Sequence, residues 1–426
     1  MLISRENKEA FLKLSDAADA ISEFFTQNNY KGKRVLLIIP DNTRSGPIGE
    51  IFKIIYSYLG PQAKSVDCLV ALGTHQPLTQ EQICKRLSLS PRQRSGKYAS
   101  VGLFNHQWAK NDTFTSIGKI SSDQIDRLSN GLFREEVNVA INKMIFDYDE
   151  LFIVGPVFPH EVVGFSGGHK YIFPGIAGPD IINFFHWLGA VITNPVINGH
   201  KWTPTRNVVE KAAEFIDMPR KLFAIVAIRD KLKGLYIGDV LDAWEKAADL
   251  SRRVHIVCEN RPYKTVLGIA PDMYEDIWTA GKVMYKLESV VADGGSLIIY
   301  APHICEFSYT HGKIIERIGY HCRDYFLKHP EKFTAVPKAV LAHCTHVKGI
   351  GTFINGVEEP RINVILATRI DKQRCESVNL GYMNYEQINI SSCENRRDKG
   401  ILVVKNAGEI LYRLNRRQNM YHGKRG

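Results

Sequence analysis

A glycine-rich segment with several reactive side chains stands near the middle of the chain. It runs from Pro159 to Gly178 and holds His160, His169 and Lys170, and His186 follows shortly after it. Glycines at this density let backbone N–H groups approach a bound group closely and permit positive φ. A lysine beside such a loop can contact a phosphate or, when shielded from water, act as a nucleophile. The segment therefore predicts a ligand-binding loop around Lys170, with a plain glycine-rich turn as the alternative.

The residues next to Lys170 exclude one familiar kind of site. A nucleotide-binding P-loop needs a glycine directly before its lysine and a serine or threonine directly after it. Here His169 precedes Lys170 and Tyr171 follows it. A Walker-type nucleotide site is therefore not predicted.

Two earlier loops carry reactive side chains directly after an apolar run that predicts a strand. One run ends in Asp41-Asn42-Thr43-Arg44, the next is followed by a loop with His75, and a third precedes His160. In open parallel sheets, ligands bind at the carboxyl ends of the strands. Taken alone, each residue also fits a capped turn or a hydrogen-bonding role. Together, the three loops favour a common site.

Apolar and amphipathic runs alternate along the chain and predict the elements that position these loops. Helices are predicted over 8–29, 48–59, 240–250 and 277–291, with further starts near residues 79 and 181. Strands are predicted over 34–40, 65–72, 150–157, 223–228, 254–258, 263–271, 296–301, 338–343 and 361–367, and a small β-rich segment over 101–144. Asp293-Gly294-Gly295 is expected to stop the helix before it.

This alternation of strand, loop and helix is typical of an α/β fold with mainly parallel sheets flanked by helices. Arg261-Pro262 marks a linker between two such units. We therefore predict an N-terminal cofactor-binding and catalytic domain over 1–260. A C-terminal α/β domain over 261–426 would contribute substrate contacts, with the active site in the cleft between the two domains.

Length and composition agree with two globular domains. The chain has 426 residues, of which 44% are apolar and 23% charged, enough to bury two substantial cores. The N-terminus lacks the apolar core of a signal peptide, and no stretch approaches membrane-spanning length. We therefore expect a cytoplasmic protein that does not enter a membrane.

The net charge and the spacing of the cysteines limit the kinds of molecule that the protein is expected to bind. The net charge is +10, but the basic residues are not interleaved with stacking aromatics, so nucleic acid is not predicted. A small anionic molecule fits the charge as well. None of the eight cysteines forms a C-x-x-C pair, which excludes a zinc knuckle and a thioredoxin motif.

The motifs resemble those of the nickel-pincer lactate racemase family. Asp41-Asn42-Thr43-Arg44 matches the family's Asp-x-Thr-Arg, and Gly73-Thr74-His75 matches its Gly-x-His. The family's long central pattern and the lysine of its second domain are matched by Pro159-His160, Gly164 to Lys170, Pro174 to Gly178, His186, and Lys282 ahead of Gly294-Gly295. The matches extend over most of the chain and agree in spacing.

The resemblance implies an isomerase that inverts C2 of a 2-hydroxy acid by proton-coupled hydride transfer. It implies a cofactor, nickel(II) pyridinium-3,5-bisthiocarboxylic acid mononucleotide, which would accept the hydride. Lys170 would hold this nickel-pincer nucleotide covalently, His186 would ligate the nickel, and Asp41 to Arg44 would contact the cofactor. An imidazole ligand suits nickel(II).

The resemblance also assigns the acid–base and substrate residues. His75 and His160 would exchange the hydroxyl proton on opposite sides of the substrate, a role that suits histidine near neutral pH. Arg44 and Lys282 would hold the substrate carboxylate.

One position departs from the lactate enzymes. Where they have a substrate-contacting glutamine, this chain has Thr279, which is shorter and leaves room. The departure argues for a hydroxy acid other than lactate, such as a sugar acid. Further polar residues of the second domain would serve a larger substrate or are ordinary loop polarity: His303, Glu306, His311, His343, His346 and Lys348.

Two other functions stay open on the residues alone. One is a hydrolase or lyase that binds a metal through His75, His160 and His186 without an organic cofactor. The other is a non-catalytic protein that binds or carries nickel or the cofactor. Loss of Lys170 would affect such a carrier, whereas loss of His75 or His160 would not.

Overall fold

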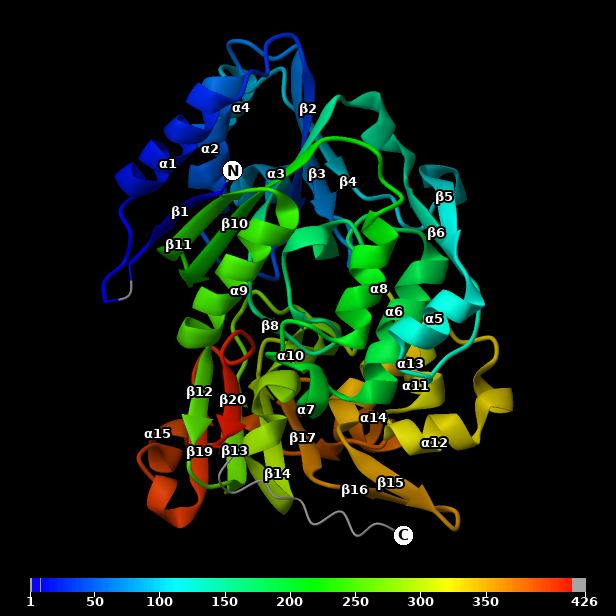
Figure 1. Ribbon diagram of the computed structural model, residues 1–426. Helices are drawn as coiled ribbons and strands as arrows, with labels where there is room; N and C mark the ends of the chain where they lie inside the picture. Colours follow the sequence, from blue (N-terminus) through cyan, green and yellow to red (C-terminus); the bar gives the residue numbers. More distant parts are fainter. Residues whose placement is uncertain (1, 8, 416–426) are drawn as a thin grey trace. The chain divides into compact units, whose positions relative to one another are not determined.

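The computed structural model describes residues 2–7 and 9–415 and divides the chain into two compact units (Figure 1). Unit 1 holds the residues up to 158, then 165–185 and 201–254. Unit 2 holds 159–164, 186–200 and the residues from 255 onward. The chain therefore passes between the units several times. The last passage lies close to the predicted boundary at residue 260, and the two short segments 159–164 and 186–200 pack with unit 2.

Unit 1 is built on a seven-stranded sheet with the order β1-β11-β10-β7-β2-β3-β4. In that order the strands are Ile3–Glu6, Lys231–Gly238, Arg220–Ile228, Glu150–Pro156, Arg34–Pro40, Ser65–Ala71 and Gly102–Asn105. β10, β7, β2, β3 and β4 run parallel, and β11 and β1 form an antiparallel edge. The strand order reverses between β2 and β7, and ligands of such sheets bind outside the carboxyl ends of the strands at this point.

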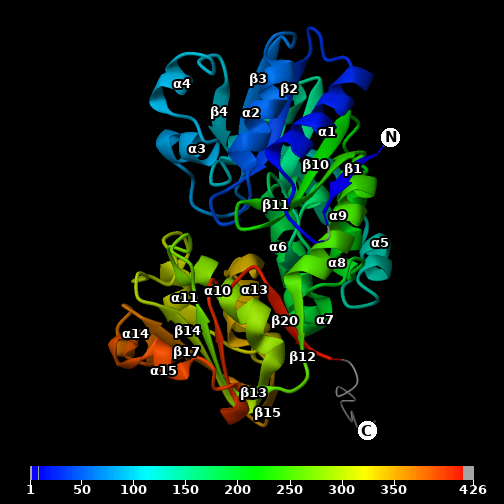
Figure 2. The same ribbon diagram turned by 90° about the vertical axis from the view of Figure 1, so that its left-hand side faces the viewer.

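The interior of this sheet is apolar on both faces, as a parallel sheet covered by helices requires. All residues of β2 after Arg34 are buried, and all of β7 is buried. α1 (Leu14–Gln27) and α2 (Ile48–Leu59) lie side by side over one face (Figure 2). The other elements grouped mainly with unit 1 are α3 (Gln80–Arg86), α4 (Pro91–Ser95), β5 (Phe114–Ile120), α5 (Ser122–Leu128), β6 (Val137–Asn142), α8 (Pro204–Ala213) and α9 (Val240–His255).

Unit 2 contains a five-stranded parallel sheet with the order β18-β17-β14-β13-β19. In that order the strands are Gly381–Tyr382, Asn363–Thr368, Val291–Ala301, Tyr263–Ile269 and Ile401–Val404. α10 (Ile277–Leu287) connects β13 to β14 and packs on both strands and on α13 (Lys338–Lys348). The remaining elements are α7 (Asn194–Ile197), β12 (Ile256–Glu259), α11 (Gly312–Ile318), α12 (Arg323–Lys328), β15 (Gly351–Ile354), β16 (Val357–Pro360), α14 (Lys372–Ser377), α15 (Ile390–Cys393) and β20 (Leu411–Leu414).

Three short elements follow β7 and belong to the glycine-rich segment and its continuation. β8 (Pro159–His160) and β9 (Gly164–Phe165) pair with one another, and Gly168–Tyr171 forms one 3₁₀ turn. α6 (Pro179–Ile192) then belongs to unit 1 up to Phe185 and to unit 2 from His186. The predicted α/β class with mainly parallel sheets is confirmed.

Two predicted elements are wrong. The run 338–343 is part of helix α13 and not a strand, because a short buried apolar run has no periodicity that separates the two. Asp293-Gly294-Gly295 does not stop a helix, since α10 already ends at Leu287 and these residues lie within β14. They form a bulge there, where the pairing with β13 shifts register and Gly294 has a φ of +70°.

In the described part of the chain, no helix is both long enough and apolar enough to cross a membrane.

The aromatic centre of unit 1 predicts where its stability is concentrated. Phe152 is fully buried, with its ring centroid 5.1 Å from both Tyr30 and Phe223. We expect Phe152→Ala to lower the free energy of unfolding by about 3–5 kcal/mol, because it removes buried contacts and leaves a cavity. Phe146, which is 50% exposed, is the matched control. Phe146→Ala should change stability by no more than about 0.5 kcal/mol in urea titrations, and equal losses would contradict this packing.

Candidate functional site

The strand-end loops of unit 1 bring a histidine and a carboxylate together. Asp41 follows β2 and is buried, and its Oδ2 lies 2.5 Å from Nδ1 of His75, which follows the neighbouring strand β3. The other carboxylate oxygen of Asp41 accepts hydrogen bonds from the backbone N–H and the hydroxyl of Thr43, at 3.0 and 2.8 Å. Asp41 is thereby fixed in orientation. It holds His75 in the tautomer with the proton on Nδ1, which leaves Nε2 as the basic nitrogen.

The main chain around His75 is also fixed. The indole N–H of Trp108 donates to the carbonyl oxygen of His75 at 2.8 Å, and the N–H of His75 donates to the carbonyl of Leu72 at 2.9 Å. The side chain of His75 stays 30% exposed. A ring that is held at Nδ1 and reachable elsewhere has the geometry of a general base. Nothing in the sequence near Trp108 marked it as a support for this histidine.

Asn42, Thr43 and Arg44 are half-buried in the loop between β2 and α2. Arg44 donates to the carbonyl of Thr43 at 3.3 Å. Its charge also reaches the neighbouring loop, where Arg44 acts on the phenol of Tyr171. Burial raises the pKa of Tyr171, an effect that Arg44 partly offsets, so this phenol stays protonated.

The glycine-rich segment is hydrogen-bonded directly to the loop of His75. The N–H of Gly73 donates to the carbonyl of Gly175 at 2.9 Å. A Cβ on Gly175 would lie 2.1 Å from the carbonyl oxygen of Tyr171, so only glycine fits there. The peptide bond before Pro174 is cis. The segment that carries Lys170 and the loop that carries His75 are therefore neighbours within unit 1.

A buried cation anchors the start of the glycine-rich loop. Arg206 on α8 is 0% exposed and donates to the carbonyls of Phe165 and Gly167, while its guanidinium lies 4.0 Å from the ring centroid of Trp244. Burial lowers the pKa of Arg206 only to about 10, so it remains charged at neutral pH. Glu210 accepts from it at 3.2 Å and supplies the balancing charge.

Glu210 also fixes the side chain of His169. The Nδ1 of His169 lies 2.6 Å from Glu210, and its Nε2 accepts from Nε of Arg220 at 3.0 Å. Burial raises the pKa of Glu210, but the hydrogen bonds from His169 and the charge of Arg206 outweigh it and lower the pKa overall. Both nitrogens of His169 are thus engaged in holding the turn. Its neighbour Lys170 is half-buried in the same 3₁₀ turn.

His106 anchors the far end of the same segment. It is fully buried, its Nε2 lies 3.2 Å from the carbonyl of Ala177, and its Nδ1 lies 3.2 Å from the amide nitrogen of Asn142. These two contacts fit a neutral ring, and burial lowers its pKa to about 4.

Unit 2 holds the second candidate histidine. His160 is buried, and its Nδ1 accepts from the backbone N–H of Val162 at 3.1 Å. Because this N–H can only donate, the neutral ring carries its proton on Nε2. Glu161 lies 3.5 Å from the same Nδ1 and 3.8 Å from the ammonium of Lys286, which is itself buried. Sequence reasoning missed Glu161 and Lys286, although Lys286 stands one helical turn after Lys282.

α10 presents the remaining predicted substrate residues. Lys282 is buried, with its ammonium 4.9 Å from the ring centroid of Tyr274. The hydroxyl of Thr279 lies 2.8 Å from the carboxylate of Asp276, which caps the helix by accepting from the N–H of Thr279 at 3.0 Å. With its proton committed to the cap, the Thr279 hydroxyl is left with acceptor lone pairs.

Other polar residues proposed for a larger substrate have structural partners in unit 2. The ammonium of Lys348 donates to the carbonyl of Asn379 at 2.6 Å, and Glu306 pairs with Arg374 at 2.8 Å. His343 lies 3.0 Å from the hydroxyl of Tyr285. Lys348, Glu306 and His343 therefore each connect to another residue of unit 2.

The histidine predicted to ligate nickel, His186, is half-buried on α6 and belongs to unit 2. Among the residues that the structure describes, no three His, Cys, Asp or Glu side chains converge as a metal site would require. The imidazole of His186 is a donor that nickel(II) accepts, and the half-buried Lys170 in a glycine-rich turn fits the attachment of a cofactor.

The burial of His106 predicts a loss of stability in acid. The unfolded chain binds a proton at this histidine near pH 6.5, whereas the native ring does so only near pH 4. The contribution is therefore nil above pH 6.5 and destabilises the fold by up to roughly 3 kcal/mol as the pH falls to 4. We expect His106→Gln to flatten this part of a plot of unfolding free energy against pH. The matched control His329→Gln, at a partly exposed ring, should leave the slope unchanged, and an unaltered slope in His106→Gln would refute the assignment.

Comparisons with known proteins show which sequences this chain is similar to. Residues 17–197 match the family described as the lactate racemase N-terminal domain. Lactate racemase from Lactiplantibacillus plantarum is 26% identical over 283 residues, 64% of this chain and 61% of the relative. Lactate racemase from Thermoanaerobacterium thermosaccharolyticum is 23% identical, with 63% of this chain and 60% of the relative aligned. The alignments thus span about three-fifths of these curated relatives.

Two solved structures extend the likeness to the whole fold. A crystal structure of a protein from Thermotoga maritima has a TM-score of 0.89 and 31% identity, and covers 96% of this chain and 100% of its own. The lactate racemase apoprotein from Thermoanaerobacterium thermosaccharolyticum has a TM-score of 0.66 and 18% identity, with 96% and 90% covered, which shows a shared fold. The chain is therefore similar to the lactate racemases, and its residues 17–197 match the model of their N-terminal domain.

Proposed function

We propose that this protein is a racemase or epimerase that inverts C2 of a 2-hydroxy acid. The observation that carries the proposal is the Asp41–His75 pair at the carboxyl ends of β2 and β3, joined by the Gly73–Gly175 hydrogen bond to the segment of Lys170. A held histidine beside a lysine-bearing loop, at the reversal of the strand order, supports chemistry on a small ligand. Kinship with the lactate racemases supplies the reaction class.

Inversion without a free carbanion requires an acceptor for the hydride of C2. The nickel-pincer nucleotide would supply that acceptor when it is bound. Lys170 would hold the cofactor through its amine, and His186 would contribute the protein ligand to nickel. Asp41 is engaged with both Thr43 and His75, so Arg44 and Asn42 are the residues of their loop with side chains best suited to contact the nucleotide.

His75 would exchange the hydroxyl proton of one enantiomer. Its Nε2 is basic because Asp41 fixes the proton on Nδ1, and transfer from the substrate hydroxyl would leave the ring positively charged beside this carboxylate. Loss of the proton converts the hydroxyl towards a carbonyl as the hydride departs. A planar 2-keto acid results, which can accept hydride on either face.

His160 would serve the opposite enantiomer. Its Nδ1 accepts from Val162, so the proton of its neutral ring lies on Nε2. To act as the acid, the ring would first take up a second proton at Nδ1 and would then give its Nε2 proton to the oxygen of the keto acid, which returns it to a neutral imidazole. Glu161, held by Lys286, stands beside the ring and would stabilise it when it is protonated. One histidine that starts as a base and one that starts as an acid are what inversion in either direction demands.

The substrate carboxylate would be held by Lys282 and Arg44. Thr279 presents acceptor lone pairs, since its proton is used in the cap of α10. It would therefore favour a substrate with an additional hydroxyl, which can donate to it, over lactate.

The acid–base assignment predicts a sharp loss of activity in three variants. His75→Ala and His160→Ala should each lower kcat for racemisation of a panel of chiral 2-hydroxy acids by about a hundredfold or more. Asp41→Asn should cost roughly 10–100-fold, because an amide no longer fixes the tautomer of His75. His329→Ala is the control and should retain activity. Wild-type kcat should be bell-shaped in pH, and a flat profile between pH 5 and 8 would exclude the histidine pair.

The cofactor assignment predicts a covalent adduct that does not depend on turnover. Protein expressed together with the cofactor's biosynthetic enzymes should show, in denaturing mass spectra, an added mass of about one mononucleotide that maps to Lys170. Lys170→Ala should lack this mass, because no amine remains to form the bond, whereas His75→Ala and His160→Ala should keep it. Adducts in all variants, or in none, would reject attachment at Lys170. A protein that keeps the adduct but inverts no hydroxy acid would instead be a carrier.

A further inference from the structure

We propose that unit 2 carries a second ligand site, for a small carboxylic acid with a hydrogen-bond donor at its other end, in a cavity beside His346. The proposal does not rest on the racemase function. It concerns a place that includes none of the residues to which the proposed function gives a role, although the sequence had suggested His346 as a contact for a larger substrate.

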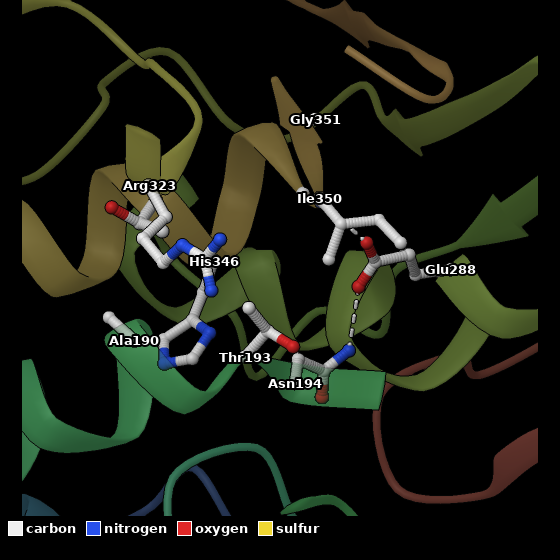
Figure 3. Close-up of a pocket in the computed structure, with 10 residues that line it drawn as sticks. Ala190, Thr193, Asn194, Glu288, Arg323, His346, Ile350 and Gly351 are labelled. Carbon is white, nitrogen blue, oxygen red and sulfur yellow. Dashed lines mark hydrogen bonds between the residues drawn. The ribbon is translucent and has the colours of Figure 1, made fainter. Parts of the chain in front are cut away.

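The cavity has a volume of about 220 Å³ and lies where the end of α6, α7, the end of α13 and the start of β15 meet. Figure 3 shows Arg323 and His346 on one side of it and Glu288 with Asn194 on the other. All these residues belong to unit 2. One side therefore offers positive charge and an imidazole, and the opposite side offers a carboxylate.

Two buried polar atoms at this cavity lack a protein partner. Thr345 and His346 are each only 4% exposed and both line the cavity. Within residues 2–7 and 9–415, neither Oγ1 of Thr345 nor Nε2 of His346 has a hydrogen-bond partner. A buried polar group without a partner costs free energy, so a position that keeps two of them points to a ligand or water that satisfies them. Burial also lowers the pKa of His346 to about 4, so its ring is neutral and can both donate and accept.

Arg323 has donors left for a carboxylate. Its Nε and one terminal nitrogen contact Asp324 at 2.9 and 2.8 Å, and the other terminal nitrogen donates to the carbonyl of Val191 at 3.0 Å. A guanidinium has five N–H groups, so these contacts leave one N–H on each terminal nitrogen in the described structure. These two remaining donors, one on each terminal nitrogen, can be taken up by the two oxygens of a carboxylate.

Glu288 can receive the other end of the ligand. It is fully buried, with one oxygen accepting from the N–H of Ile350 at 2.8 Å and the other from the amide of Asn194 at 2.9 Å. Each carboxylate oxygen has a second lone pair, so an incoming hydroxyl or ammonium can still be accepted. Gly349, whose Cβ would lie 2.9 Å from a Glu288 oxygen, keeps the approach open.

Size limits the ligand further. The cavity is smaller than the roughly 300–1,000 Å³ of a site for a drug-sized molecule. A carboxylic acid of a few carbons with a hydroxyl or amino group fits this volume and these donors. Hydroxy acids and amino acids share that chemistry, and binding experiments separate them.

The test measures binding of four three-carbon probes to the purified full chain by calorimetry. Glycerate carries a carboxylate and hydroxyls, serine a carboxylate and an ammonium, propionate only a carboxylate, and glycerol only hydroxyls. We expect glycerate or serine to bind at least roughly tenfold more tightly than propionate and glycerol, because only they can use both sides of the cavity. The tighter of the two identifies the class.

Two cavity variants locate the site. Arg323→Met should weaken binding of the preferred acid by roughly tenfold or more, since it removes charged hydrogen bonds. Thr345→Val should weaken it by about threefold while leaving the melting temperature of the ligand-free protein unchanged or raised, because it removes an unsatisfied hydroxyl.

Lys282→Met is the matched variant outside the cavity and should leave binding of serine unchanged. Glycerate is itself a 2-hydroxy acid that the proposed substrate position can hold, so for glycerate Lys282→Met should leave unchanged only the binding that Arg323→Met removes. The proposal is overturned if neither acid binds at tens of millimolar, or if binding survives both cavity variants. It is also overturned if Lys282→Met alone abolishes binding, because the acid would then occupy the proposed substrate position. None of these binding results decides the racemase function, which is tested separately by the activity of the His75 and His160 variants.

Discussion

The glycine-rich loop is closed around one buried positive charge. Arg206 contributes no surface area to solvent, yet it binds two carbonyls of the loop and stacks on Trp244, and Glu210 balances its charge. Burying a guanidinium is costly unless its donors are satisfied, so the loop and the cation stabilise each other only in this one arrangement. The same carboxylate holds His169, which fixes the turn in which Lys170 stands. The position of Lys170 thus depends on the charge network formed by Arg206, Glu210 and His169.

The candidate functional residues are divided between the two units. Unit 1 holds His75 with its carboxylate and the loop of Lys170, whereas unit 2 holds His160, His186 and Lys282. Each unit prepares its histidine differently. Nδ1 of His75 donates a hydrogen bond to Asp41, whereas Nδ1 of His160 accepts one from the backbone N–H of Val162, so the two neutral rings carry their protons on opposite nitrogens. This opposition follows from local hydrogen bonds and does not require the sequences around the two histidines to be alike.

Local sequence patterns predicted the framework of unit 1 well. The strand over Arg34–Pro40 and the helix over Ile48–Leu59 have the predicted bounds, because both are continuous apolar or amphipathic runs ended by turn residues. Asp41 and His75 follow β2 and β3 and lie close together, as the rule that ligands bind at the carboxyl ends of parallel strands predicts. In unit 2, the apolar run 338–343 predicts a strand but lies in helix α13. Ten consecutive residues of this helix are buried, so its sequence shows no alternation of apolar and polar positions at helical spacing.

Partners far apart in the chain could not be predicted. Nothing in the sequence joins His169 to Glu210, 41 positions later, or Lys286 to Glu161, because such pairs form only when the folded chain brings them together. Asp41 was expected to contact the cofactor through its motif, and its bond to His75 was not foreseen. The hydrogen bond between Gly73, in the loop of His75, and Gly175, in the segment of Lys170, could not be foreseen either.

One position of this contact nevertheless restricts the sequence, because residue 175 must be glycine. The carbonyl of Tyr171 leaves no space for a methyl group at residue 175, so an aligned relative with any larger residue there must have a different turn over residues 171–175. That single column of an alignment would therefore separate proteins that keep this turn, which is hydrogen-bonded to the loop of His75, from those that share only the fold.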